Sequence, residues 1–371
     1  MNLKKTSITI AVAILFITAS ALCLQHRHRA DRIDVRLATP APFLQEVLKS
    51  GSPAFLSPEF LPFVPEDRKV LLPSIKECEA AARDKTTFWK LNRDHHFEVV
   101  LLGANPAWSH LLNSILLSPL WVLSDVSPWG YLFKPNLPGS SAWQPPAERV
   151  LKERWPTGLD RARFMILTAA NLTAINHGDE AEGLLELAAA THELPSLILS
   201  TQASLAACRG NWEEAANRAR ESLHADRHNR AAQEILIRAL VEKGFTDEAL
   251  EKARSLVATQ GEDEGTLFLL ARAANAANSR AEEIDTLARL VTVAKKHGQP
   301  LGASLSYLGQ AYAKKGQRSE ALHAFQEAFL APELTGEERK VIREIMDHLM
   351  EGNVPSSTLP PLTEGKREKA K

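Results

Sequence analysis

The stretch GASLSYLGQAYAKKGQRSEALHAFQEAFLAPELT, residues 302–335, decides the fold of this chain. Its apolar and small residues recur at helical intervals on both sides of Gly316. The positions that define the pattern are Leu305, Leu308, Gly309, Tyr312, Ala321 and Phe325. Gly316 can end the first helix in a left-handed turn at little conformational cost. The stretch therefore predicts two antiparallel helices that cross closely at Gly309 and Ala321.

The same pattern recurs toward the N-terminus of the chain. Equivalents of Gly316 stand at Asn278, Gly244, Gly210 and Gly178, at successive intervals of 38, 34, 34 and 32. The segments that begin at Gly210 and at Gly244 match the one that begins at Gly316 almost position for position. One hairpin cannot bury its own apolar face, so the repetition predicts a stack of about five hairpins over roughly 160–334.

The order Leu-x2-Leu-Gly-x2-Tyr, then Ala-x3-Phe and Pro332, resembles the 34-residue tetratricopeptide repeat. This resemblance implies an α-solenoid whose first helices line a concave groove for a protein or peptide partner. Some members of the family grip a partner's C-terminal carboxylate with lysine and asparagine side chains, which are absent from the matching positions here. The groove positions that the resemblance implies are Ser200, Ser204, Glu234, Arg238, Phe268, Arg272, Ser306 and Gln310.

A last helix, Gly336 to Met350, is expected to cap the stack. Ile342, Ile345 and Leu349 form one apolar stripe on it, opposite a charged face, which suits the terminal helix of a solenoid. We assign residues 159–351 to the solenoid with this capping helix. Residues 352–371 are rich in Pro, Ser, Lys and Glu, which predicts a disordered tail.

The N-terminus carries an uncharged apolar run, Ile8 to Leu24, which follows Lys4 and Lys5. The run predicts a signal peptide or a membrane anchor within residues 1–29. It is close to the length of a membrane span, yet an Ala-Ser-Ala site ending at Ala21 also permits cleavage and secretion. We expect a single-pass membrane protein whose C-terminal part is periplasmic or otherwise extracytoplasmic, although the arginines after the run favour the opposite orientation.

Residues 75–134 differ from the repeats and predict a small α/β module. The expected elements are a helix at 75–91, a buried strand at 97–102, a helix at 107–117 and paired strands at 120–123 and 131–133. The module is faintly similar to soluble segments of some bacterial membrane proteins of the glycosyltransferase kind, a similarity that transfers no functional residue. Proline-rich stretches flank it: a partly docked segment at 30–74 and a linker at 135–158.

The composition argues against several functions. A formal net charge of −1 provides no electrostatic reason to expect nucleic acid as a partner. Cys23, Cys78 and Cys208 are too far apart in sequence for a zinc or disulfide pattern, and we interpret the last two as small buried residues. The common nucleotide-binding, hydrolase and zinc-protease motifs are missing. We therefore expect no catalytic residues, no metal site and no cofactor.

Two functions remain from the sequence. The first is a mainly α, membrane-anchored bacterial scaffold that binds a protein or peptide in its groove. Arg238 and Arg272 are one repeat apart, which predicts that they bind an acidic or phosphorylated segment of that partner. The alternative is an envelope enzyme or enzyme subunit, for example in surface polysaccharide assembly, with a ligand site in residues 75–134. A pocket with convergent polar groups in that module would favour the alternative.

Overall fold

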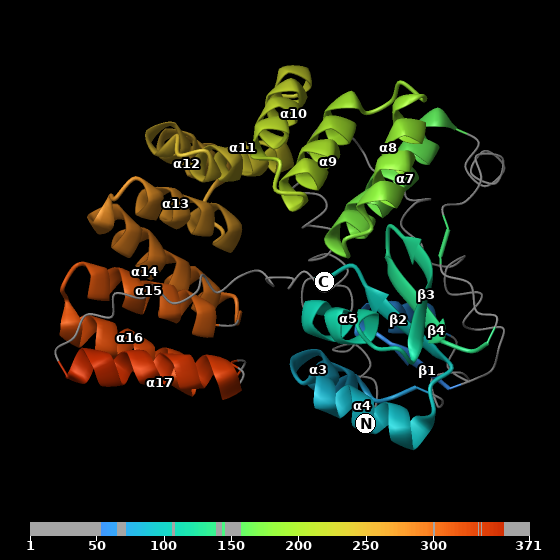
Figure 1. Ribbon diagram of the computed structural model, residues 1–371, viewed down its shortest axis with the longest axis horizontal. Helices are drawn as coiled ribbons and strands as arrows, with labels where there is room; N and C mark the ends of the chain where they lie inside the picture. The colour runs from blue at the N-terminus through green and yellow to red at the C-terminus, as the bar shows by residue number, and fades with distance from the viewer. Residues whose placement is uncertain are drawn as a thin grey trace, which may run out of the picture. The chain divides into compact units, whose positions relative to one another are not determined.

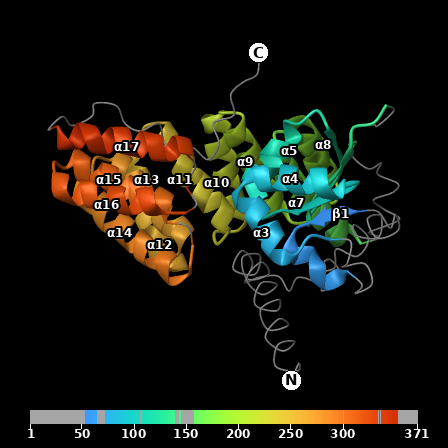
Figure 2. The same ribbon diagram turned by 90° about the horizontal axis from the view of Figure 1, so that it is seen from below.

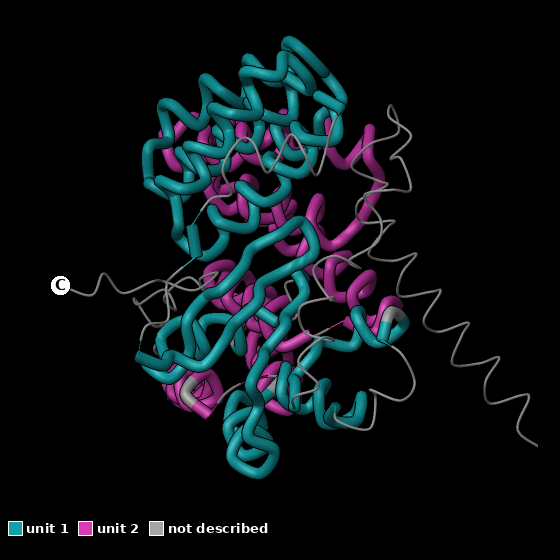
Figure 3. The backbone as a smooth tube through the Cα atoms, turned by 90° about the vertical axis from the view of Figure 1, so that its right-hand side faces the viewer, with its two compact units in different colours: residues 1–232 teal, residues 233–371 magenta. Residues whose placement is uncertain are grey.

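The computed structural model of the 371-residue chain describes residues 53–64, 72–105, 108–138, 143–144, 157–299, 301–332, 334 and 336–351. The chain divides into two compact units, residues 1–232 and 233–371 (Figure 3). Both are dominated by helices, with a small sheet in the first (Figure 1). The mainly helical, repeat-like class predicted from the sequence is confirmed.

Unit 1 begins with a four-stranded sheet in the order β1-β2-β4-β3. Its strands are β1 (Ala54–Leu56), β2 (Val99–Gly103), β3 (Trp121–Ser127) and β4 (Gly130–Pro135). Strands β1 and β2 are parallel, whereas β2 with β4 and β4 with β3 are antiparallel. The helical elements of this part are η2 (Pro58–Phe63), α3 (Ile75–Arg83), α4 (Lys85–His95) and α5 (Ser109–Leu116).

The sheet buries both of its faces, which explains why β2 is a continuous apolar run. Val100 and Leu102 belong to the large core with helices α3, α4 and α5. The alternate residues Val99 and Leu101 belong to a smaller core with Phe60 of η2. Successive side chains of a strand point to opposite faces, so both sets are buried at once.

The sheet differs from the predicted module in two places. It begins at β1, inside the segment 30–74 that we interpreted as proline-rich and partly docked. A strand this short has too little alternation to be recognised. The predicted helix at 75–91 is two helices, because Asp84 is extended and its side chain accepts a hydrogen bond from Thr86 N at 3.0 Å.

The module is not separate from the first hairpins. One continuous core runs from Phe55 to Leu205 and includes both. The Tyr131 hydroxyl donates to the carbonyl of Asn171 (3.2 Å), and Asn171 Nδ2 donates to the carbonyl of Ser127 (2.7 Å). The sheet and the first helices of the repeat region therefore form one body within unit 1.

The repeat region is a succession of helices that pack in pairs (Figures 1 and 2). They are α7 (Gly158–Ala174), α8 (Gly178–Ala189), α9 (Pro195–Cys208), α10 (Trp212–Ala225), α11 (Arg230–Glu242), α12 (Thr246–Gln260), α13 (Glu264–Ala276), α14 (Arg280–Lys296), α15 (Gly302–Lys314), α16 (Arg318–Leu330) and α17 (Gly336–Met350). The boundary between the units falls inside α11. The predicted capping helix is present as α17, which packs against α16 and buries Ile342, Ile345 and Leu349.

The turn inside each pair is left-handed at one residue. Asn176, Gly210, Gly244, Asn278 and Gly316 have φ values between 56° and 82°. In each turn this residue's N–H bonds the carbonyl three positions back, and the next N–H bonds the carbonyl five positions back. These paired bonds satisfy carbonyls that the end of a helix would otherwise leave without donors.

The position of Asn176 corrects one prediction. Gly178, which we chose as the first turn marker, is instead the first residue of α8. Asparagine is among the few residues with a β-carbon that readily adopt the left-handed conformation. With Asn176 in place, the intervals become 34, 34, 34 and 38, and the first hairpin has the ordinary length.

The crossing of α15 and α16 has the predicted small residue on each helix. A β-carbon on Gly309 would lie 3.0 Å from three atoms of the Phe325 ring. Ala321 and Phe325 are both fully buried. The close crossing of these helices therefore depends on the missing side chain at position 309.

Among the residues that the structure describes, no helix is both long and apolar enough to cross a membrane. The apolar run from Ile8 to Leu24 lies outside these residues. The predicted tail at 352–371 lies outside them as well. Both remain expectations from the sequence.

Candidate functional site

The residues predicted to face a groove fall into two groups. Ser200 and Ser306 are buried, and each hydroxyl donates to a carbonyl of its own helix, that of Leu197 (3.0 Å) or Gly302 (2.7 Å). Neither is available to a partner in this structure, which corrects the sequence-based mapping. The other six are half-buried: Ser204, Glu234, Arg238, Phe268, Arg272 and Gln310.

Ser200 belongs to a buried polar cluster instead. Its other members are Ser196, Ser222 and Asn229, so the cluster joins α9, α10 and the start of α11. Asn229 Nδ2 lies 2.9 to 3.3 Å from the hydroxyl oxygens of all three serines. Its Oδ1 accepts from the N–H of Ala232 at 3.1 Å, which caps α11. This cluster stabilises the connection between hairpins and is not a binding surface.

Within unit 2, α13 and α15 present an aromatic pair. The rings of Phe268 and Tyr307 meet edge to face, with centroids 5.6 Å apart and planes at 61°. Both side chains are half-buried. Sequence analysis missed Tyr307, although it directly follows Ser306 and so lies one step around the same helix. The pair offers a partly exposed aromatic surface between neighbouring first helices.

Arg272 already has an acidic neighbour. Its Nη2 lies 2.5 Å from Oε1 of Glu242, the last residue of α11, and each side chain is about one-third exposed. The predicted acidic partner would therefore have to compete with Glu242. The sequence signal was present, since Glu242 precedes Arg272 by a little less than one repeat.

Gln310 lies at the repeat position that matches Arg272. Its Nε2 is buried and has no hydrogen-bond acceptor in the structure. A buried donor without a partner costs about 1–3 kcal/mol.

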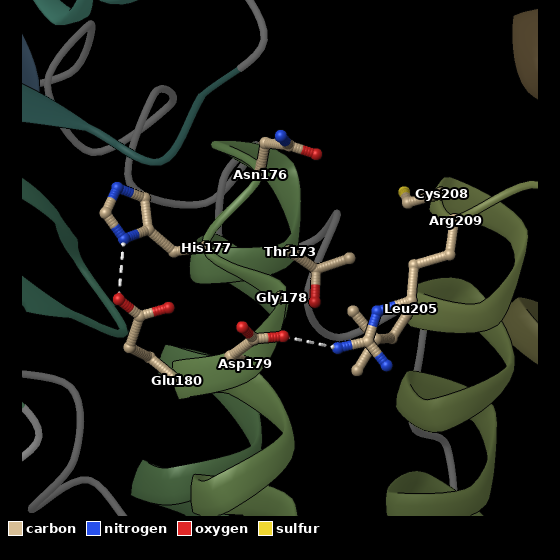
Figure 4. A pocket seen from close by; sticks show the side chains of 9 residues that line it. All are labelled: Thr173, Asn176, His177, Gly178, Asp179, Glu180, Leu205, Cys208 and Arg209. Carbon is tan, nitrogen blue, oxygen red and sulfur yellow. Dashed lines mark hydrogen bonds and ion pairs between the residues drawn. The ribbon is translucent and has the colours of Figure 1, made fainter.

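Unit 1 contains a pocket of about 350 Å³ where α7 turns into α8, beside the end of α9 (Figure 4). It is lined by Thr173, Asn176, His177, Gly178, Asp179, Glu180, Leu205, Cys208 and Arg209. Arg209 binds Asp179 (3.0 Å) and Glu182 (2.9 Å), while His177 Nδ1 lies 3.1 Å from Glu180. The positive charge of Arg209 is therefore already paired with two carboxylates. Cys208 is exposed at the rim, contrary to our interpretation, whereas Cys78 is buried.

The α/β module contains one carboxyl group in an unusual setting. Glu59 follows β1, and its Oε1 accepts from Trp108 Nε1, which follows β2, at 3.2 Å. A β-carbon on Gly103 would lie 1.6 Å from this oxygen, so the carboxyl occupies the space that a side chain at position 103 would need. Burial raises the pKa of Glu59, and hydrogen bonds, including those with Ser57 and Trp108, offset this in part.

The place of Glu59 is chemically notable because it lies beyond the carboxyl ends of two parallel strands, where open α/β sheets bind ligands. Sequence analysis missed it, since Glu59 and Trp108 are 49 residues apart. Among the described residues, no group of three or more His, Cys, Asp or Glu side chains could hold a metal ion.

Comparisons with known proteins leave the family open. No family model matches the sequence, and no curated protein matches it. Among solved structures, the chain is similar to a tetratricopeptide repeat protein from Parabacteroides merdae ATCC 43184, with 13% identity and a TM-score of 0.41. The match covers 82% of this chain and 98% of that one. A likeness of this degree assigns no function, so the repeat architecture rests on the hairpins and turns described above.

Proposed function

We propose that this chain is a scaffold whose repeats bind a protein or peptide partner along the first helices of unit 2. We further propose that residues 8–24 anchor it in a bacterial membrane, with the repeats outside the cytoplasm. The single observation that carries the binding proposal is the row of half-buried side chains at equivalent repeat positions. We call it the binding row: Glu234, Arg238, Phe268, Arg272 and Gln310, with Tyr307 beside Phe268.

The binding row suits an extended segment of mixed character. The Phe268–Tyr307 pair would take an apolar side chain of the partner, since aromatic contact contributes about 0.5–1.5 kcal/mol beyond area burial. A carboxylate or phosphate would replace Glu242 at Arg272, as charge-assisted bonds to arginine are among the stronger polar contacts. The Gln310 amide would donate to a backbone carbonyl. We therefore expect a partner segment with an apolar residue next to an acidic one.

Photo-crosslinking tests this proposal in the full-length protein. Benzoyl-phenylalanine at position 307 should capture the partner in membranes, whereas the same group at Phe245 should not. Phe245 is a suitable control because it is an exposed aromatic of unit 2, at 51% exposure, outside the binding row. Equal capture of one protein from both positions, or no capture at position 307, would contradict the proposal.

The environment of Glu59 favours the second function, an envelope enzyme or enzyme subunit. A carboxyl group whose pKa is raised is suited to proton transfer near neutral pH. We propose that, in this case, the ligand binds beyond the ends of β1 and β2. Glu59→Gln keeps the shape of the side chain and removes the proton transfer. If the Glu59→Gln variant loses the protein's function in the cell while position 307 still captures the partner, the enzyme is favoured over the scaffold.

A further inference from the structure

Three leucines of the α/β module are exposed at one end of its sheet. Leu117 follows α5 as its C-terminal cap, Leu120 precedes β3 and Leu137 follows β4, with exposures of 86%, 61% and 64%. Isolated exposed leucines are ordinary on protein surfaces, whereas clusters of exposed apolar side chains mark places of contact. The two segments that carry these leucines, residues 117–120 and 136–138, are called the leucine tip below.

Two hydrogen bonds donated by Asn136, one from its backbone and one from its side chain, hold the two segments of the leucine tip together. Asn136 N donates to the carbonyl of Leu120 (2.8 Å), and Asn136 Nδ2 donates to that of Pro119 (3.0 Å). Next to them, Trp121 and Pro135 are paired across β3 and β4. The leucines therefore stand on a connected edge of the sheet, and their exposure does not result from a loose loop.

The composition of the leucine tip indicates what covers it. Its residues are Leu, Ser, Pro, Leu, Asn, Leu and Pro, and none is charged. A surface without charge forms no ion pairs with a charged protein surface or an anionic headgroup. It does match the interfacial region of a bilayer, where apolar side chains leave water and no ion pair is required.

If residues 8–24 form the proposed anchor, the chain that follows is long enough for this surface to reach a bilayer. The proposed anchor ends at Leu24, and the first described residue is Pro53, so residues 25–52 separate them. A chain of that length spans at most about 100 Å. We propose that the leucine tip docks onto the lipid surface beside the anchor, with its leucines inserted among the lipids. This inference rests on the membrane anchoring in the proposed function.

The test uses the full-length chain reconstituted in phosphatidylcholine vesicles that contain nitroxide-labelled phosphatidylcholine. An environment-sensitive fluorophore is attached to Pro138→Cys, which keeps all three leucines, in a Cys23→Ala, Cys208→Ser background. Cys78 can stay, because burial raises the pKa of its thiol to about 12 and leaves it unreactive. The matched control is Leu330→Cys, another exposed position, at 79% on α16 of unit 2.

We expect lipid quenching several-fold stronger at position 138 than at position 330. We also expect this quenching to survive high salt and to fall in a Leu117→Ser, Leu120→Ser variant. Equal quenching at the two positions in protein that floats with the vesicles would overturn docking and leave the anchor intact. A label at position 138 that is shielded from water without lipid quenching would assign the tip to a second copy and overturn the proposal. Protein that fails to float would reject anchor and docking together.

Discussion

Replacement of Gly309 by alanine tests the helix crossing that defines the repeat. Two effects of the new methyl group oppose each other. Alanine favours a helix over glycine by about 1 kcal/mol. Its β-carbon, however, would lie 3.0 Å from three atoms of the buried Phe325 ring. Overpacking of a core costs about 1–3 kcal/mol. Because Phe325 is fully buried and has little room to move, we expect a net destabilisation of roughly 1 kcal/mol.

The neighbouring hairpin suggests how to rescue this variant. At the positions that match Gly309 and Phe325, α13 and α14 carry Ala271 and Leu287, both buried. Leucine in place of Phe325 should therefore leave room for alanine in place of Gly309. Phe325→Leu alone leaves space beside Gly309. The double variant Gly309→Ala, Phe325→Leu should therefore be more stable than the summed changes in unfolding free energy of the two single variants predict. We expect a coupling of about 1 kcal/mol, within the range for residues in contact.

The assay is urea unfolding, with hydrogen exchange of the α15 and α16 amides to separate unit 2 from unit 1. The local measurement is required because a chain of two units need not unfold in one step. Protection in α15 and α16 should fall in Gly309→Ala and return in the double variant, while the amides of α7 and α8 stay unchanged. Strictly additive effects would refute the contact between Gly309 and Phe325 and the repeat register built on it.

Three further changes have defined outcomes. Ala321→Trp should abolish exchange protection in α15 and α16, because Ala321 is fully buried at the crossing and overpacking there costs about 1–3 kcal/mol or more; retained protection would count against the register. Asn229→Ala should lower the free energy of unfolding, measured by urea titration, by about 1–3 kcal/mol, because three serine hydroxyls lose their shared donor. Its control is Asn217→Ala, at an exposed position. The pKa of Glu59 is raised in the folded state, so its contribution to stability is present below the unfolded-state pKa and is lost as pH rises through the folded-state pKa. Glu59→Gln should therefore gain stability relative to wild type as pH rises through that window, and parallel pH profiles would show that the carboxyl is not perturbed.

The sequence was sufficient to predict the hairpins because their turns repeat a visible signal. Glycine at 210, 244 and 316 shows where the backbone is left-handed, and α17 spans the predicted range, Gly336–Met350. The first turn was placed wrongly because its left-handed residue is Asn176, whereas three of the other turns have glycine at this position. Periodicity thus predicts the repeat well and its unusual members less well.

The candidate site was harder to predict because it depends on contacts between distant residues. Ser200 and Ser306 occupy groove positions of the repeat pattern, yet both are buried. The Glu242–Arg272 pair and the Phe268–Tyr307 contact join different hairpins. A repeat pattern assigns each residue a face of its own helix, whereas exposure depends on what the next hairpin places against that face.

The proposed function requires that a partner binds along the binding row of unit 2. The most direct test is the affinity of the partner captured at position 307 for full-length wild type and for the Phe268→Ala, Tyr307→Ala variant. We predict that the variant keeps its helical circular dichroism and binds at least about tenfold more weakly, the equivalent of about 1.4 kcal/mol. Phe245→Ala should bind like wild type. Unchanged affinity in the folded double variant would contradict the claim.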